Sequence, residues 1–324
     1  MSEPTAAYLA ARRPEHPDLI FVGGTGRSGT HVLSHLLGSH PRYARVPIEC
    51  RFHCNPQGFP DLLSGAVGPD AFLRKLRKFW WRRIRAGEVA PVVVKRLAFG
   101  RKVRGLHKIV PRERFDAALD DFEQTHEDDL VVACRNLFFD LLWPLTAEQG
   151  KPGLVEMSCF TIAAAPALQR IFPEAKFIHT VRDGRDAGSS KVSKRQKRSH
   201  PRDGFEGLRW WEGRLRNIER GVVAMDDRSA LRVVSLDDLV AGDREGSYAG
   251  IRAFTELDDH PEMRAFFDAE MNAGAAHKER WRGGLSPERQ AELEREYEKT
   301  LERLEAEAFH CAPVLRAAYE RQPA

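Results

Sequence analysis

The stretch that decides the fold is Leu19-Ile20-Phe21-Val22-Gly23-Gly24-Thr25-Gly26-Arg27-Ser28-Gly29-Thr30-His31. Its first five residues are apolar or small and predict a buried strand, Leu19 to Gly23. The glycines that follow predict a tight turn, and the pattern of Val32 to Leu37 is compatible with a helix. In such a turn the backbone N–H groups and the positive end of the next helix converge on one point, which makes a cradle for an anion.

Other short runs of β-branched and aromatic residues predict further strands. Lys176 to Val181 and Leu231 to Ser235 are the clearest, and Pro91 to Lys95 and Gly153 to Met157 are weaker. Leu19 to Gly23 and Lys176 to Val181 each run into a glycine-containing turn and then a helix-compatible segment. We therefore expect an α/β fold with a parallel, helix-covered sheet.

The composition is that of an ordinary globular protein. The chain has 324 residues, of which 42% are hydrophobic and 30% charged, and no apolar run approaches the roughly 20 residues of a membrane-spanning helix. The N-terminus lacks the apolar core of a secretory signal. The five cysteines are an odd number and unclustered, apart from Cys50 and Cys54. We therefore expect reduced thiols and a cytoplasmic location, and no zinc site at Cys50, His53 and Cys54, because no second Cys/His pair lies at finger spacing.

Basic residues concentrate between Arg74 and Arg85, where no acid interrupts them. Leu73, Leu76, Trp80 and Ile84 recur there at helical spacing, which predicts an amphipathic basic helix over 73–85. Its charged face is either simply solvated or a docking surface for an anionic acceptor or a membrane. A second basic segment, Lys191 to Phe205, predicts a surface loop or a lid. We expect an N-terminal tail over 1–18 and a single domain over 19–324.

The glycine-rich turn resembles a nucleotide-binding P-loop but lacks two of its functional groups. The spacing of Gly24 and Gly29 fits the Walker pattern, yet Thr30 stands where the lysine belongs and His31 where the magnesium-holding hydroxyl belongs. We therefore expect a phosphate cradle that needs no metal and takes its positive charge from Arg27.

Gly24 to Thr30 resembles the 5′-phosphosulfate loop of sulfotransferases that use 3′-phosphoadenosine 5′-phosphosulfate (PAPS). Arginine within that loop is similar to the Golgi (tyrosylprotein-type) and bacterial branches. The segment Arg182-Asp183-Gly184-Arg185-Asp186, with Ser190 on the helix that follows, resembles the second hallmark of this family. That hallmark is the end of a strand followed by a serine on the next helix. The resemblance covers Leu19 to about Leu285. It implies a three-layer α/β/α fold, with acceptor-binding insertions at about 49–125 and 191–207.

The resemblance also implies the site. PAPS would be the co-substrate, without a metal, and the acceptor a hydroxyl or amine of a small molecule, saccharide, lipid or peptide. Arg182 and Ser190 would hold the 3′-phosphate. A late segment would place Lys278 and Arg280 near phosphate, and Trp281 near adenine or packed beneath it. The phosphosulfate loop would contribute Gly26, Arg27, Ser28, Gly29, Thr30 and His31.

Glu49 is the strongest candidate for the general base, because it resembles the Glu of a Glu-x-Arg segment that follows the loop in related enzymes. A carboxylate beside Arg51 is ionised at neutral pH and can accept a proton. The alternative is a purely structural pair of Glu49 with Arg51 or Arg45. His31 and His53 are the other candidate bases. Arg27 would offset the charge on the leaving oxygen. Lys95 and Arg96 are candidate basic residues of the site, since the lysine common before the second hallmark is replaced by Met157.

Two other classes of function remain open at this stage. One is a P-loop nucleotide kinase or phosphotransferase, against which the missing Walker residues argue. The other is a non-enzymatic module that binds anions or nucleic acid. The basic runs lack the interleaved aromatic residues that stack on bases, so we expect no nucleic-acid partner.

Overall fold

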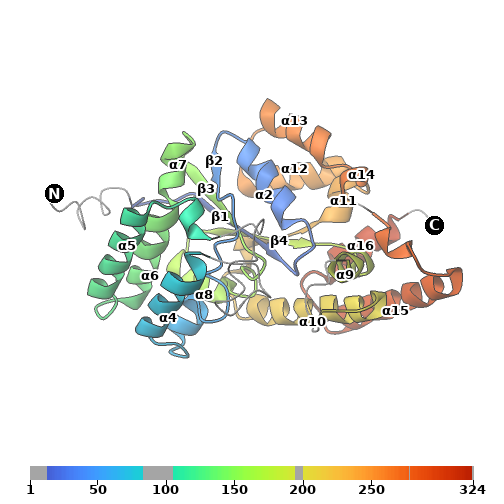
Figure 1. Ribbon diagram of the computed structural model, residues 1–324. Coiled ribbons are helices and arrows are strands. Elements are labelled where there is room, and N and C mark those ends of the chain that lie inside the picture. The colour runs from blue at the N-terminus through green and yellow to red at the C-terminus, as the bar shows by residue number, and fades with distance from the viewer. Residues whose placement is uncertain (1–12, 83–104, 194–199, 277, 323–324) are drawn as a thin grey trace, which may run out of the picture.

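The fold is built on a parallel β-sheet (Figure 1). The structure is a computed structural model that describes residues 13–82, 105–193, 200–276 and 278–322. In these residues the sheet has five strands, in the order β2-β3-β1-β4-β5. They are β1 (Leu19–Gly24), β2 (Tyr43–Arg45), β3 (Gly153–Met157), β4 (Lys176–Val181) and β5 (Leu231–Ser235). All neighbouring pairs are parallel, which confirms the predicted α/β class.

Helices cover both faces of this sheet (Figure 1). The first half of the chain holds α2 (Thr30–Ser39), α3 (Phe59–Leu63), α4 (Pro69–Lys75), α5 (Arg112–Thr125), α6 (Leu130–Leu142) and α7 (Pro144–Glu148). The second half holds α8 (Ala165–Ile171), α9 (Gly184–Val192), α10 (Gly204–Val223), α11 (Leu236–Val240), α12 (Arg244–Thr255), α13 (Pro261–Glu270), α14 (Ala273–Ala276), α15 (Pro287–Ala306) and α16 (Ala312–Glu320).

Alternation along β1 divides the core between the two faces. Ile20 and Val22 pack with side chains from α2, α11, α12 and α13. Leu19 and Phe21 pack on the other face with side chains from α3 to α8. Because both faces are buried, β1 has no polar side chain, which is why it was readable as a continuous apolar run.

The strand order places a switch point between β1 and β4. The chain leaves β1 toward β2 on one side of the sheet, whereas β4 leads to β5 on the other. Gly24 pairs in register with Thr180, so the glycine-rich turn and Arg182 emerge at the same carboxyl edge. Ligands of open parallel sheets bind at such a point.

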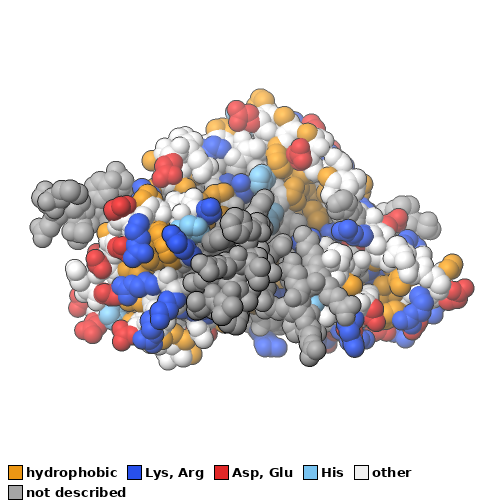
Figure 2. Space-filling model, in the orientation of Figure 1, with side chains coloured by type: hydrophobic (Ala, Val, Ile, Leu, Met, Phe, Trp, Pro, Cys, Tyr) orange, Lys and Arg blue, Asp and Glu red, His pale blue; other side chains and the backbone are white. Residues whose placement is uncertain are grey.

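Some local predictions were incomplete. The three-residue strand β2 was not predicted, and Pro91 to Lys95 lies outside the described residues. The basic helix begins as α4 but changes to a π-helical turn over Leu76–Trp80, and 83–85 is not described. Leu73, Leu76 and Trp80 are buried as predicted, and Lys and Arg side chains gather on the surface around α4 (Figure 2).

Two segments bear on the limits of the domain. Leu130–Glu148 is long and apolar enough to cross a membrane by length and composition, but most of α6 is buried against the core, which accounts for its composition. In the predicted tail, Arg13 donates to Asp140 at 2.8 Å, and Asp18 accepts from Tyr43 at 2.6 Å. These contacts attach the described part of the tail to the body.

Candidate active site

The glycine-rich loop has a backbone that few residues other than glycine adopt. Gly26, Arg27 and Gly29 have φ values of +81°, +65° and +93°. For Arg27 this conformation costs about 1–3 kcal/mol, and strain of this kind concentrates at functional sites. A Cβ on Gly29 would lie 2.8 Å from Leu236 Cδ1, so the close approach also requires glycine.

Helix α2 begins directly after this loop, at Thr30. No side chain caps its N-terminus, and no acidic residue lies in its first turn. The first turn of α2 therefore contributes no carboxylate that would offset the positive end of the helix dipole, and this end can stabilise an anion.

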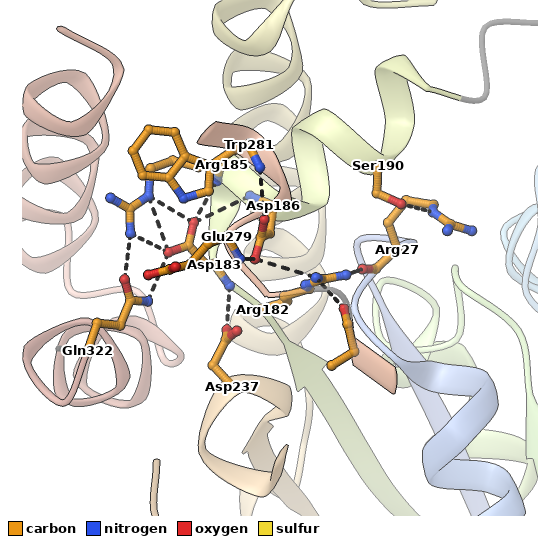
Figure 3. A network of polar contacts seen from close by, with 11 residues as sticks. Arg27, Arg182, Asp183, Arg185, Asp186, Ser190, Asp237, Glu279, Trp281 and Gln322 are labelled. Atoms are coloured by element: carbon orange, nitrogen blue, oxygen red, sulfur yellow. Dashed lines mark hydrogen bonds and ion pairs between the residues drawn. The ribbon is translucent and has the colours of Figure 1, made fainter. Parts of the chain in front are cut away.

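The two sequence motifs meet at the carboxyl edge of the sheet (Figure 3). Arg27 Nε donates to Ser190 Oγ at 2.9 Å across 163 positions of sequence. Arg182 extends from the end of β4 and donates to the Ala276 carbonyl at 2.7 Å and to the Arg27 carbonyl at 3.5 Å. The loop, β4 and α9 thus contribute to one site.

A pocket of about 370 Å³ opens beside these residues. Its charged lining has three arginines, Arg27, Arg182 and Arg280, against one carboxylate, Glu270. Burial and the positive charge of Arg182 lower the pKa of Arg27. Cations held this close favour an anionic ligand that lies among them. The other residues of the lining are Gly29, Thr30, His31, Val32, Ser190, Leu236, Val240, Ala275 and Ala276.

Asp183 and Arg185 fix the start of α9. Asp183 caps the helix by accepting from the backbone N–H groups of Arg185 and Asp186. The Arg185 guanidinium is fully buried and donates to Asp183 Oδ2 at 2.5 Å. It also lies 4.6 Å from the ring centroids of Trp281 and Tyr297. This pair is structural, and it holds α9, and with it Ser190, against the C-terminal helices.

Asp186 links α9 to the late basic segment. Its carboxylate accepts from the backbone N–H groups of Glu279 at 2.9 Å and Trp281 at 3.2 Å, and it lies 3.4 Å from Arg182 (Figure 3). Arg280 lies between these two anchored residues and reaches the pocket. Asp186 therefore positions two of the three pocket arginines.

Glu49 lies beside the loop rather than in the lining of the pocket. It is 9% exposed, and its Oε2 accepts from Arg51 Nε at 2.8 Å. Its Oε1 accepts from Cys159 Sγ at 3.2 Å, and that sulfur lies 3.6 Å from the position of a Cβ on Gly26. The carboxylate is thus one side chain away from the loop, and it also makes the ion pair with Arg51 that was considered as a structural alternative.

The remaining predicted residues fall into distinct places. His31 is exposed and lines the pocket, as does Thr30. Ser28 is buried and shares a hydrogen bond of 3.1 Å with Thr180 on β4, so its side chain attaches the loop to the sheet. Lys278 is half-buried outside the lining, and Lys95 and Arg96 lie outside the described residues.

Two aromatic-ring candidates are in the core. Trp281 is 3% exposed and packs in a hydrophobic cluster with α9, α10 and α15, not in the pocket. His53 is fully buried, with Nε2 at 2.9 Å from Glu156 Oε2. Burial lowers the pKa of His53, but the facing Glu156 carboxylate, together with Cys54, outweighs this effect and raises the pKa to about 10. The structure therefore removes His53 as a base, because it cannot meet a substrate.

Sequence reasoning missed Arg214 and Cys159. Arg214 lies on α10, with its guanidinium 3.9 Å from the Phe160 ring centroid and its Nε 3.4 Å from the Thr25 carbonyl. Burial, followed by the negative charge of Glu49, raises the pKa of Cys159 to about 12, so it is a neutral thiol. No motif marks either residue: the packing of α10 against the loop brings Arg214 there, and the pairing of β3 with β1 brings Cys159 there.

Several solved structures resemble the chain at low sequence identity. The sulfotransferase domain of the Synechococcus PCC 7002 olefin synthase is 17% identical, with 85% of this chain and 92% of that chain covered and a TM-score of 0.44. Sulfotransferase STF9 of Mycobacterium avium is 17% identical, with 91% and 80% covered and a TM-score of 0.43. Sulfotransferase STF1 of Mycobacterium tuberculosis H37Rv is 16% identical, with 82% and 73% covered and a TM-score of 0.42.

The match to a protein family is more informative than these likenesses. No curated protein matches the chain at a significant level. The sequence pattern of the sulfotransferase family matches residues 17–262 of the 324. This range contains both the glycine-rich loop and the Arg182–Ser190 segment, and it decides against the kinase and nucleic-acid alternatives. The chain belongs to the sulfotransferase family.

Proposed function

We propose that this sulfotransferase uses PAPS as its sulfuryl donor. The observation that carries the proposal is the 2.9 Å hydrogen bond between Arg27 and Ser190, in a pocket that Arg182 also lines. A donor with phosphate groups at both its 3′ and 5′ positions needs two cationic sites a short distance apart. The loop and the β4–α9 junction supply them.

The 3′-phosphate would bind Arg182 and Ser190. A guanidinium offers five N–H groups in a planar fork that suits a phosphate, and Arg182 lines the pocket. Arg280 would add a third positive charge, and Asp186 would keep both arginines in place. In this proposal Trp281 supports the segment by packing and does not stack on adenine.

The phosphosulfate end would bind the loop, from Gly26 to His31. Left-handed residues in the loop and the uncapped N-terminus of α2 suit an anion there. Arg27 would stabilise the charge that develops on the leaving oxygen, an effect of about 3–4 kcal/mol for a well-placed donor. No step in this arrangement requires a metal ion.

Glu49 would accept the proton of the acceptor. Its place beside Cys159 and Gly26 supports this role, since the acceptor must approach the sulfur in line with the leaving oxygen. The acceptor would be a hydroxyl or amine of a small molecule, saccharide, lipid or peptide, bound by the insertions at about 49–125 and 191–207. His31, at the pocket, is the second candidate base.

We also propose that residues 19–324 act as a single domain in the cytoplasm. All five cysteines are free, which suits a reducing compartment. The exposed Arg74, Arg77, Lys78 and Arg82 would give peripheral contact with anionic surfaces.

The donor site can be tested by calorimetry with adenosine 3′,5′-bisphosphate and with adenosine 5′-phosphosulfate. Arg182→Ala should weaken the bisphosphate by about 10- to 150-fold, the loss expected for a charge-assisted hydrogen bond. It should change binding of the 5′-phosphosulfate little, because that ligand lacks the 3′-phosphate. Arg112→Ala, an exposed arginine on α5, is the matched control and should change neither. Equal losses for both ligands would refute the assignment of Arg182.

A further inference from the structure

A second cluster of ligand-type side chains lies outside the donor pocket. His179 on β4 and His310 and Cys311 in the turn between α15 and α16 place one nitrogen or sulfur atom each within 4.8 Å of one another. His179 Nδ1 lies 2.8 Å from His310 Nε2. His179 and Cys311 are fully buried. None of the three lines the donor pocket, and none has a part in the proposed transfer.

Glu219 on α10 orients the imidazole of His310 through contacts on the side away from His179. Its Oε2 accepts from the backbone N–H of His310 at 3.1 Å and also contacts His310 Nδ1. A carboxylate on Nδ1 fixes the tautomer in which that nitrogen carries the proton. The Nε2 lone pair of His310 then points toward His179. Histidines that bind metals are oriented by carboxylates in the same way.

We propose that His179, His310 and Cys311 bind a divalent metal ion of the zinc type, with Glu219 as the outer partner of His310. Two imidazoles and a thiolate are the ligands that zinc prefers, and magnesium and calcium prefer oxygen. The fourth ligand would be water. This site differs from the sequence-based expectation that the protein holds no metal.

The hydrogen bond between the two imidazoles occupies the position of the ion. The ion takes the place of the proton between His179 Nδ1 and His310 Nε2. That proton moves to Nε2 of His179, so the two imidazoles release no proton when the ion binds. Cys311 loses its thiol proton to solvent and binds as the thiolate. Tetrahedral zinc with Zn–N bonds of about 2.0–2.1 Å needs the nitrogens about 3.3 Å apart, so they must separate by about 0.5 Å.

His310 can supply this movement and the route for the ion. It lies in a turn, its side chain is 15% exposed, and it lines a surface pocket of about 620 Å³. A bound ion would connect β4 to the α15–α16 turn and, through Glu219, to α10. Because His179 lies on β4, three residues before Arg182, the ion would stabilise the strand that leads into the donor site.

Binding can be measured on the full chain after treatment with a chelator. Titration with Zn²⁺ should give one site with a Kd tighter than about 1 µM, and zinc should raise the Tm by several degrees. Co²⁺ should give the intense near-ultraviolet band of a thiolate–cobalt bond. Cys311→Ser should abolish that band, and His310→Ala should weaken zinc by at least tenfold.

Controls separate this site from adventitious binding to other cysteines and histidines. Cys134→Ala and His126→Ala, both outside the cluster, should leave the Zn²⁺ titration and the Co²⁺ band unchanged. His310→Ala keeps the buried His179 and should fold, which the far-ultraviolet CD spectrum can verify. No tight site, or equal losses in the control variants, would overturn the proposal. Binding of adenosine 3′,5′-bisphosphate reports separately on the donor site.

Discussion

Replacing Glu49 by glutamine separates a general base from a structural partner. Glutamine keeps the shape of the side chain and one acceptor oxygen for Arg51, but it cannot take a proton. If Glu49 is the base, kcat should fall by about 10²–10⁴, which corresponds to about 2.7–5.5 kcal/mol in the barrier. Affinity for adenosine 3′,5′-bisphosphate should stay near that of the unchanged protein, because Glu49 does not line the donor pocket.

The structural cost of the same change should be smaller. The Glu49 side chain is 9% exposed and that of Arg51 27%, so solvent screens part of their attraction. We expect a loss of roughly 1 kcal/mol of unfolding free energy, together with a weakened contact to the Cys159 thiol. The effect on kcat should therefore exceed the effect on stability by at least 1 kcal/mol.

The assay measures single-turnover rates and denaturant unfolding on one preparation of each variant. Glu148→Gln is the matched control, because Glu148 also pairs with an arginine, Arg114, but lies on α7. An unchanged kcat per folded molecule in Glu49→Gln, with a lowered Tm, would refute the role as base. The search would then move to His31.

Three other predictions follow from the buried charges and from the loop. The rate of transfer should be the same with and without added Mg²⁺, because Thr30 and His31 replace the Walker lysine and hydroxyl; a strict magnesium requirement in initial-rate assays would contradict this. Burial, and then the charge of Asp183, raises the pKa of Asp237 to about 7. The folded protein therefore holds this proton more tightly than the unfolded chain, and stability should fall as pH rises from about 4 to 7. Asp237→Asn should flatten that slope in urea unfolding, and an unchanged slope would count against the assignment. His53→Ala leaves Glu156 buried without its counter-charge and should cost about 3–5 kcal/mol in denaturant unfolding; a loss below 1 kcal/mol would show that the pair contributes little.

The sequence was sufficient for most of the sheet. The ranges of β3, β4 and β5 agree with the predicted strands, and β1 extends one residue further. β1, β3 and β4 are buried almost throughout, and the edge strand β5 is half-buried over its first three residues. Their short β-branched and aromatic runs are therefore readable without knowledge of their neighbours. The three-residue β2 carries no such signal, and its pairing with β3 depends on contacts distant in sequence.

The sequence also identified most of the polar residues that line the candidate donor pocket. The glycine spacing, Arg27 and the Arg182–Ser190 segment could be identified because each motif is local and its backbone geometry follows from residue type. That the two motifs share one pocket was expected from their family resemblance. The hydrogen bond between Arg27 and Ser190 shows the contact itself.

Only the tertiary structure decided the environment of the other candidates. His53 and Trp281 are polar or aromatic residues whose role depends on burial, and burial is set by helices far away in the chain. The packing of α10 and of the α15–α16 turn against the sheet places Arg214 and assembles the cluster of His179, His310 and Cys311. The pairing of β3 with β1 places Cys159 beside the loop. Local sequence encodes strands and turns, but the distance between side chains more than a hundred positions apart exists only once the strands are ordered and the helices are packed.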